Sequence, residues 1–352
     1  MSETAERAPE EVAALPPTPG LGGGFWGAVK RFGAVLAQQR EATVFVVAVL
    51  LVIYFWRAAP AFLTKDNIVN ISQITAPVAI IAIGEVFLLV CGEIDLSVGF
   101  IFAFSPFLMH YLIDYYGVPA TLAIIISLLF GVVAGFINGF ITVVLQVPSF
   151  ITTLGTGFIL FGLMLTTSNA YPANIPAKAE GIGHWVGTYA WAEITWAVVL
   201  TAVFHILLRR TKWGLHTISV GGNRLGAAEA GVNVSRIRYG NFMLCALLAG
   251  FVGIQIAFQT SIIDTFSGGA GYQAMFYAVS AAVIGGTAML GGSGTMIGAF
   301  LGALVLAILL DGFSVIGVSA YPLQIFFGGA ILIAMVLNVQ LARLRAAGRV
   351  KS

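Results

Sequence analysis

Long apolar runs alternate with short polar segments along almost the whole of this 352-residue chain. A helix that crosses a membrane needs roughly 20 mostly apolar residues. About ten runs approach that length, and this pattern predicts an all-α membrane protein, a polytopic bundle of about ten transmembrane helices. The runs lie at residues 42–58, 74–92, 97–116, 119–145, 149–168, 191–208, 240–258, 273–290, 295–312 and 322–339.

Composition supports the same class of protein. The chain is 59% hydrophobic and 9% charged, whereas soluble domains carry about 25% charged residues. A chain this apolar needs membrane lipid as its solvent. Its net charge of +2, without a basic patch, argues against nucleic acid as a partner. Cys91 and Cys245 lie in or beside apolar runs, which indicates small buried hydrophobes rather than a disulfide or a metal pair.

The ends of the chain differ from its apolar middle. Residues 1–24 are acidic and then rich in Pro and Gly, which predicts a disordered cytoplasmic tail rather than a signal peptide. Residues 25–40 favour a short helix in the membrane interface, and an ordinary cytosolic lead-in fits them equally well. The transmembrane domain is expected at 41–340, followed by a basic cytoplasmic tail at 341–352.

Basic residues predict the orientation, because cytoplasmic loops are enriched in Lys and Arg. Such residues gather before the first run, in the loop at 209–239 and after the last run. With ten spans all three clusters lie on one side of the membrane, which places both termini in the cytoplasm. The opposite side then holds residues 169–194, which could cap an entrance or serve as a plain connector.

Two apolar segments contain glycine-bearing breaks at similar places in the two halves of the chain. They are "IAIGEVFLLVCGEIDLSVG" at 81–99 and "AAVIGGTAMLGGSGTMIG" at 281–298. Matched broken helices point to a transport path, although glycines also allow close helix packing in lipid. Broken helices are therefore expected in the bundle.

Acids inside apolar segments are costly and favour a functional interpretation. Glu85 lies about halfway through its run, and a pathway or gating role is favoured for it. Asp95 precedes "LSVG" in the manner of a helix cap, so a cap or turn is favoured over a pathway role. Other polar residues in apolar context, such as Gln255, more often join helices than contact a substrate. The candidate pathway residues are Glu85, Glu93, Asp95, Asn138, Gln273 and Asp311.

The loop at 209–239 contains "NRLGAAEAGVN", which predicts a short helix capped by Asn223 and ended by Gly231. Small residues on a short exposed helix suit insertion into a groove on another protein. An amphipathic turn lying on the membrane surface is the alternative.

Motifs for catalysis are absent from the sequence. The Gly-rich string at 291–298 has no lysine, so it lacks the pattern of a phosphate-binding loop. The four histidines do not have metal-ligand spacing, and no nucleophile or zinc-protease signature occurs. These observations favour transport or conduction over a membrane enzyme, and no cofactor is expected in this chain.

Four strings in order resemble the permease subunits of bacterial ABC importers for simple sugars, the ribose, xylose, arabinose and galactoside group. They are "EIDLSVG" at 93–99, "VPSFITTL" at 147–154, "GGNRLGAAEAGVNVSRIR" at 221–238 and "VIGGTAMLGGSGTMIGAFLGAL" at 283–304. The resemblance runs from about residue 60 to 340. The first two strings are most like those of xylose-type permeases, although this chain is shorter and lacks extra spans after the long external loop.

The resemblance implies an architecture and partners. Two permease copies, expected as a homodimer, form the pathway, and an extracytoplasmic binding protein delivers the sugar. A separate cytosolic ABC ATPase, which holds ATP and Mg, docks on the coupling helices. The residues that match the coupling motif are Gly222, Asn223, Arg224, Ala227, Ala228 and Gly231.

Two departures from the family pattern affect the expected substrate. The stretch "YQAMFYAVSAAVIGG" at 272–286 has no acid where members commonly carry one, and Glu85 stands where many carry an uncharged residue. Both departures hint at a pentose, a polyol or an unusual sugar. The alternative function is a stand-alone secondary transporter with Glu85 as its proton-coupling acid.

Overall fold

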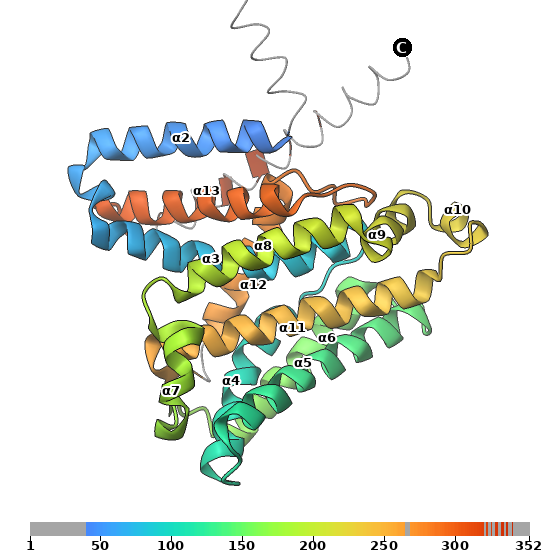
Figure 1. The fold of residues 1–352 in the computed structure, drawn as a ribbon, viewed down its shortest axis with the longest axis horizontal. Helices are drawn as coiled ribbons and strands as arrows, with labels where there is room; N and C mark the ends of the chain where they lie inside the picture. Colours follow the sequence, from blue (N-terminus) through green and yellow to red (C-terminus); the bar gives the residue numbers. More distant parts are fainter. Residues whose placement is uncertain are drawn as a thin grey trace, which may run out of the picture. The chain divides into compact units, whose positions relative to one another are not determined.

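The computed structural model describes residues 40–264 and 268–319, together with individual positions between 322 and 340. This part of the chain is almost entirely helical, which confirms the predicted all-α class (Figure 1). Its one small sheet pairs β1 (Ala173–Asn174) with β2 (Ile262–Ile263) in antiparallel fashion.

Seven helices in the described ranges are long and apolar enough to cross a membrane, judged by length and composition. They are α2 (Arg40–Ala58), α3 (Lys65–Val90), α5 (Ala120–Val143), α6 (Ser149–Ser168), α8 (Ala192–Arg210), α11 (Val234–Thr260) and α13 (Met296–Val315). Two apolar helices are shorter, α4 (Val98–Asp114) and α12 (Gly268–Ile284). The shortest elements are η1 (Pro60–Leu63), η2 (Ala177–Ala179), α7 (Glu180–Gly183), η3 (His184–Thr188), α9 (Lys212–Gly222) and α10 (Arg224–Glu229).

Each of the first nine predicted runs therefore coincides with a helix. Three helices begin well before the apolar runs that predicted them: α3 starts at Lys65 rather than 74, α11 at Val234 rather than 240, and α12 at Gly268 rather than 273. The first turns of α3 and α11 carry polar residues, which a search for apolar runs leaves out. Helix α12 also ends at Ile284 rather than 290, because the last residues of that run belong to the second glycine-bearing segment. The tenth run, at 322–339, falls where only individual positions are described.

The predicted tails and interfacial helix cannot be compared with the structure. The segments 1–24 and 341–352, and all but the last residue of 25–40, lie outside the described residues.

Helix α3 lies at the centre of the described bundle. Its most apolar stretch is 83% buried, whereas that of α2 is only 17% buried. In Figure 1, α2 lies beside α13 and α13 beside α3 and α8, while α11 lies beside α5 and α4. Helix α11 also packs against α3, and α12 contacts α3, α4 and α13. The outer helices carry the exposed apolar side chains that lipid would cover.

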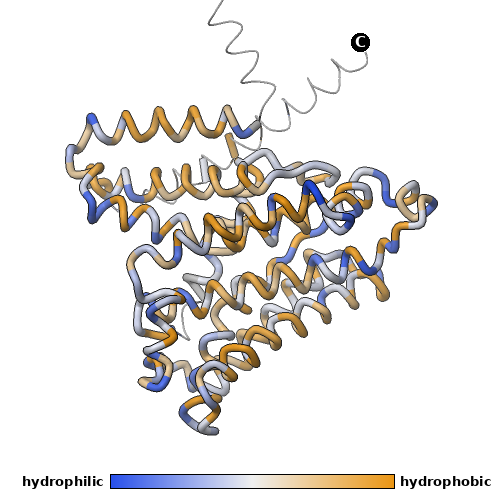
Figure 2. Tube along the Cα trace, viewed as in Figure 1, coloured by the Kyte–Doolittle hydropathy of each residue, from blue (hydrophilic) through white to orange (hydrophobic). Residues whose placement is uncertain are grey.

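Close approach between helices depends on small residues, as expected in lipid. A Cβ atom added at Gly135 of α5 would lie 2.5 Å from the backbone oxygen of Phe242 in α11, so only glycine allows this crossing. Figure 2 shows apolar residues along the lengths of the helices and hydrophilic residues mainly at their ends and in the connections.

Candidate functional site

The two glycine-bearing breaks meet at the C-terminal end of α3. The first break is the connection 91–97 between α3 and α4, and the second is the connection 285–295 between α12 and α13. The backbone N–H of Gly292 in the second break donates a hydrogen bond of 2.8 Å to the carbonyl oxygen of Val90, the last residue of α3. The sequence indicated both breaks, and the structure shows that they are in contact.

The end of α9 reaches the same place. A Cβ atom added at Gly221 would lie 1.6 Å from the Val90 carbonyl oxygen, so the backbone of α9 lies directly against the end of α3. On the other side of this contact, Gly291 and Gly292 have φ values of 93° and 79°, a left-handed conformation that glycine adopts without strain. The contact therefore requires glycine at 221, and the left-handed backbone favours glycine at 291 and 292.

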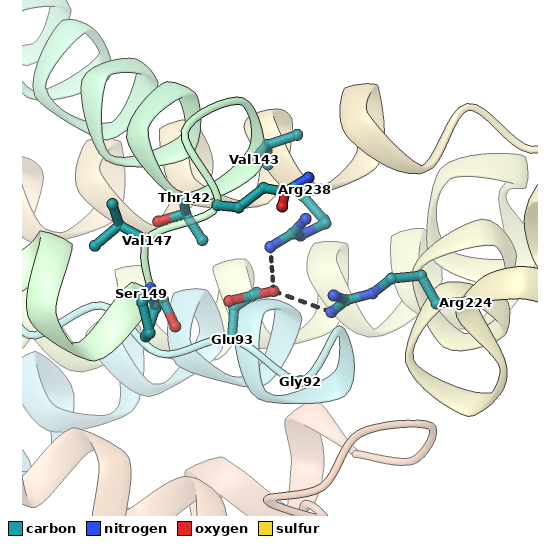
Figure 3. A pocket seen from close by; sticks show the side chains of 10 residues that line it. Gly92, Glu93, Thr142, Val143, Val147, Ser149, Arg224 and Arg238 are labelled. Atoms are coloured by element: carbon teal, nitrogen blue, oxygen red, sulfur yellow. Dashed lines mark hydrogen bonds and ion pairs between the residues drawn. The ribbon is translucent and has the colours of Figure 1, made fainter.

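Glu93 of the first break forms two ion pairs with arginines from the α9–α11 region (Figure 3). Its Oε1 atom accepts from Nη2 of Arg224, the first residue of α10, at 3.0 Å. The same Oε1 accepts from Nη2 of Arg238, near the start of α11, at 2.6 Å. Nη2 of Arg224 also donates to the backbone oxygen of Cys91 at 3.3 Å. We call Glu93, Arg224 and Arg238 the Glu93 clasp.

Burial is unequal within the Glu93 clasp. The side chain of Glu93 is 6% exposed and that of Arg238 is 11% exposed, whereas that of Arg224 is 50% exposed. A buried carboxylate is stable only when it is paired. Arg238 therefore provides the buried counter-ion, and Arg224 adds a second, solvent-accessible one. The Glu93 clasp carries a net positive charge, because two guanidinium groups face one carboxylate.

A cavity of about 570 Å³ lies beside the Glu93 clasp. Figure 3 shows Glu93 and the two arginines at its wall, with the connection between α5 and α6 on the other side. Its lining residues come from the first break, from the end of α5 and its connection to α6, and from α10 and α11: Gly92, Glu93, Thr142, Val143, Gln146, Val147, Pro148, Ser149, Arg224 and Arg238.

Asp95 is not part of the Glu93 clasp and instead stabilises the connection between α3 and α4. Its Oδ1 atom accepts from the backbone N–H of Ser97 at 2.8 Å and from the Ser97 hydroxyl at 2.6 Å. The amide of Asn138 in α5 donates to the Ser97 Oγ at 2.8 Å. The backbone N–H of Leu96 donates to Thr153 Oγ1 in α6 at 3.0 Å. The first break is therefore held by side chains of α5 and α6.

Glu85 lies fully buried in α3, before the break. The Sγ of Cys245 in α11 donates to its Oε1 at 3.7 Å. Its Oε2 has no hydrogen-bond partner among the described residues. Glu85 thus stands apart from the Glu93 clasp.

The remaining predicted pathway residues also lie apart from it. Asp311 of α13 is buried and accepts from the amides of Asn67 at 2.6 Å and Asn70 at 2.7 Å, near the start of α3. Gln273 of α12 is exposed. Gln255 of α11 is buried and donates to the Val186 carbonyl oxygen at 3.1 Å. Asp311 and Gln255 have the geometry of groups that join one segment to another.

The short helix predicted in the 209–239 loop is confirmed as α10. The Asn223 side chain caps it by accepting the N–H of Gly226 at 2.9 Å. Gly231 ends it with φ +83°, and its N–H donates to the oxygen of Ala228. Ala227 faces inward, against the buried side chains of Val220 and Ile237. The other residues that match the coupling motif, Gly222, Asn223, Arg224, Ala228 and Gly231, are exposed.

The sequence did not indicate Arg238 as part of a site. Glu93 in an apolar break was itself a signal, because a buried carboxylate requires a cation. The basic residues of the 209–239 loop were candidates for that cation, because they were predicted on the same side of the membrane as Glu93. Apart from Arg224, which matched the coupling motif, they served only to indicate orientation. The pairing of Arg224 with an acid 131 positions away was not visible in any local pattern.

Metal binding has no support in the described ranges, which contain no group of three or more His, Cys, Asp or Glu side chains arranged to hold an ion. The site is instead a junction of two helix breaks with an exposed helical hairpin, in a polytopic helical bundle. Helix breaks that meet inside a polytopic bundle are typical of membrane transport proteins.

The chain belongs to the family described as the branched-chain amino acid transport system / permease component, which matches residues 67–336. It is 37% identical over 311 residues to the xylose/arabinose import permease protein XylH of Sulfolobus acidocaldarius, covering 86% of each chain. It is 31% identical over 313 residues to the ribose import permease protein RbsC of Escherichia coli, covering 87% of this chain and 94% of that one.

Another relative, the probable ABC transporter permease protein YphD of Escherichia coli, is 32% identical over 306 residues, covering 86% of this chain and 90% of the relative. No solved structure matches the chain. The resemblance to sugar-importer permeases is therefore confirmed, and the chain is a multi-pass transport permease.

Proposed function

We propose that this chain is the membrane-spanning subunit of an ATP-driven importer that moves a monosaccharide, a pentose-like sugar or a polyol, into the cytoplasm. The family description mentions branched-chain amino acids, whereas relatives with a named cargo import xylose, arabinose or ribose. Similarity to those relatives over most of the chain favours a sugar. A neutral sugar also needs no strong ionic site in the pathway, only hydrogen-bonding groups.

The observation that carries the proposal is the exposed α9–α10 hairpin at the end of α3. A short exposed helix with small residues fits a groove on a partner protein, and α10 contacts the α3–α4 break through Arg224. In the proposed complex, a separate cytosolic ABC ATPase binds α10 and holds ATP and Mg. A second permease copy completes the pathway, and an extracytoplasmic binding protein delivers the sugar. Both termini then lie in the cytoplasm.

Reconstitution into proteoliposomes tests this proposal. The permease is combined with the ATPase and the binding protein of the same importer, and uptake of labelled xylose, arabinose and ribose is measured. We expect uptake of at least one sugar that requires ATP and both partners, with no uptake of leucine. Sugar uptake by the permease alone, driven by a proton gradient, would instead establish the stand-alone transporter. ATP-driven uptake of leucine in preference to the sugars would contradict the proposed substrate class.

A further inference from the structure

The Glu93 clasp connects the proposed ATPase-binding helix to the centre of the bundle. Arg224 begins α10, the exposed helix, and Glu93 lies in the connection between α3 and α4. Two residues further along that connection, Asp95 begins the turn held by α5 through Asn138. A displacement of α10 would therefore reach three helices of the bundle through a single carboxylate.

The unequal burial of the two arginines determines which ion pair can break. If Glu93 were paired with one arginine alone, separating them would leave a buried charge without a partner, which is strongly unfavourable. Here Arg238, buried beside Glu93, keeps the carboxylate paired when Arg224 leaves. Arg224 is half exposed, so water solvates its guanidinium on release. Because Glu93 stays paired with Arg238 and Arg224 becomes hydrated, opening this ion pair costs less than leaving a buried carboxylate without a partner.

We propose that Glu93 is a positioning residue for transport, and that its ion pair with Arg224 opens and closes as α10 moves with the ATPase. The closed pair fixes α10 against the α3–α4 break, and the open pair releases it, while Arg238 remains bound to Glu93 throughout. This assignment rests on the proposed function, because it needs a partner that moves α10. It extends that function by naming the contact through which the movement reaches the spans.

The geometry around the end of α3 supports this assignment. The contacts of this end that do not involve α10 include backbone packing at Gly221, the hydrogen bond between Gly292 and Val90, and the bond from the Asn241 amide to Cys91. From α10, the buried residue Ala227 packs on an apolar cluster without directional bonds. The directional bonds from α10 to the break both come from Arg224, which pairs with Glu93 and donates to the Cys91 carbonyl oxygen.

The first experiment measures sugar transported per ATP hydrolysed in proteoliposomes that contain the whole importer. The variants are Arg224→Gln, Glu93→Gln and the double variant. The control is Arg236→Gln, which removes the same charge from an exposed residue of the same region. We expect each single variant to lower the ratio about fivefold or more, the lower end of typical coupling factors. The double variant should be no worse than Glu93→Gln, because Glu93→Gln already removes the ion pair with Arg224. Arg236→Gln should leave the ratio unchanged.

Three results would overturn the assignment: an unchanged ratio in Arg224→Gln, an equal fall in Arg236→Gln, or additive effects in the double variant. Arg224→Gln alters a half-exposed side chain, so the variant is expected to fold. Its binding to the ATPase is measured alongside, since a loss of binding with an unchanged ratio would mean that Arg224 only docks the partner.

A second measurement uses the permease alone and does not depend on transport. Leu225 of α10 is 71% exposed, while both native cysteines are buried, so a spin label at Leu225→Cys reports on α10 selectively. We expect Arg224→Gln and Glu93→Gln to raise the mobility of this label, and Arg236→Gln to leave it unchanged. Equal mobility in all of these proteins would overturn the link. Absence of ATP-driven uptake in the wild-type importer would contradict the proposed function instead, and the label would still test the link.

Discussion

Gly292 and Val90 lie 202 positions apart, yet a 2.8 Å hydrogen bond joins the N–H of the first to the carbonyl oxygen of the second. This bond connects the two helix breaks that the apolar pattern indicated separately. A helix leaves the carbonyl groups of its last turn without partners inside the helix, and such groups are costly when buried away from water. The second break therefore supplies a hydrogen-bond donor to the buried end of α3, and the two breaks stabilise each other.

The first prediction concerns the packing of α9 on this junction. Gly221→Ala would place a Cβ atom 1.6 Å from the Val90 carbonyl oxygen, so α9 would have to move away from α3. We expect the free energy of unfolding to fall by about 3 kcal/mol, the upper end of the usual cost of overpacking. Unfolding of the purified permease in detergent measures this change.

Its matched control is the next residue. A Cβ atom at Gly222 meets no atom within 4 Å, and alanine favours a helix over glycine by up to about 1 kcal/mol. Gly222→Ala should therefore leave the stability unchanged or raise it slightly. Equal stability of the two variants would show that the contact at Gly221 is not as tight as described.

A second prediction concerns the end of α10. Gly231 has φ +83°, a conformation that costs most L-residues about 1–2 kcal/mol and that asparagine tolerates better than alanine. If α10 binds the ATPase, Gly231→Ala should weaken the affinity of the ATPase for the permease by about 5- to 30-fold, the equivalent of that energy. Gly231→Asn should weaken it less. Titration of the ATPase against the permease in detergent measures both, and identical affinities for all three proteins would exclude α10 as the binding element.

Apolar periodicity predicted the helices of this fold well, because each span must satisfy its backbone within itself and must present apolar residues to lipid. It failed at the start of α3. Residues such as Asn67 and Asn70 look like a connection, but they form hydrogen bonds with Asp311 of α13. Helix α9 was missed for a related reason, since "KWGLHTISVGG" contains glycines and β-branched residues and lies in a polar loop.

The candidate site could be predicted only in part. The capping of α10 by Asn223 follows from local chemistry within a few residues, and it was visible in the sequence. The pairing of Glu93 with Arg224 and Arg238 depends on how α3, α10 and α11 are arranged. No local pattern encodes that arrangement, so the acid was noticed while its partners were not.

A third prediction separates helix packing from transport at Asp311. Asp311→Leu would remove the acceptor that the side-chain amides of Asn67 and Asn70 share, although the Asn67 amide keeps its bond to the Phe62 carbonyl oxygen. Asn67 is half-buried and Asn70 is exposed, so the cost is that of lost hydrogen bonds, about 1 kcal/mol each. The free energy of unfolding should therefore fall by about 2 kcal/mol. Asp311→Asn keeps one acceptor oxygen and should lose less. Sugar transported per ATP by the folded protein should be unchanged in both variants. A stable Asp311→Leu protein that no longer transports would instead place Asp311 in the pathway.

The last prediction concerns Glu85, the acid that distinguishes the two functions considered for this chain. A proton-coupled transporter needs a side chain that gains and loses a proton in every cycle, whereas an ATP-driven importer does not. Glu85→Gln keeps the size of the side chain and an oxygen that can accept from Cys245, but it cannot release a proton. We expect ATP-driven sugar uptake in proteoliposomes to stay within about twofold of the wild-type rate between pH 6 and pH 8, because this import does not use the proton of Glu85. The hydrogen bond with Cys245 is worth only about 1 kcal/mol, so a change in its strength has a small effect. Glu85→Ala serves as the comparison, since it removes the acceptor as well and should lower stability. A loss of uptake in Glu85→Gln without a loss of folded protein would show that the proton itself is required.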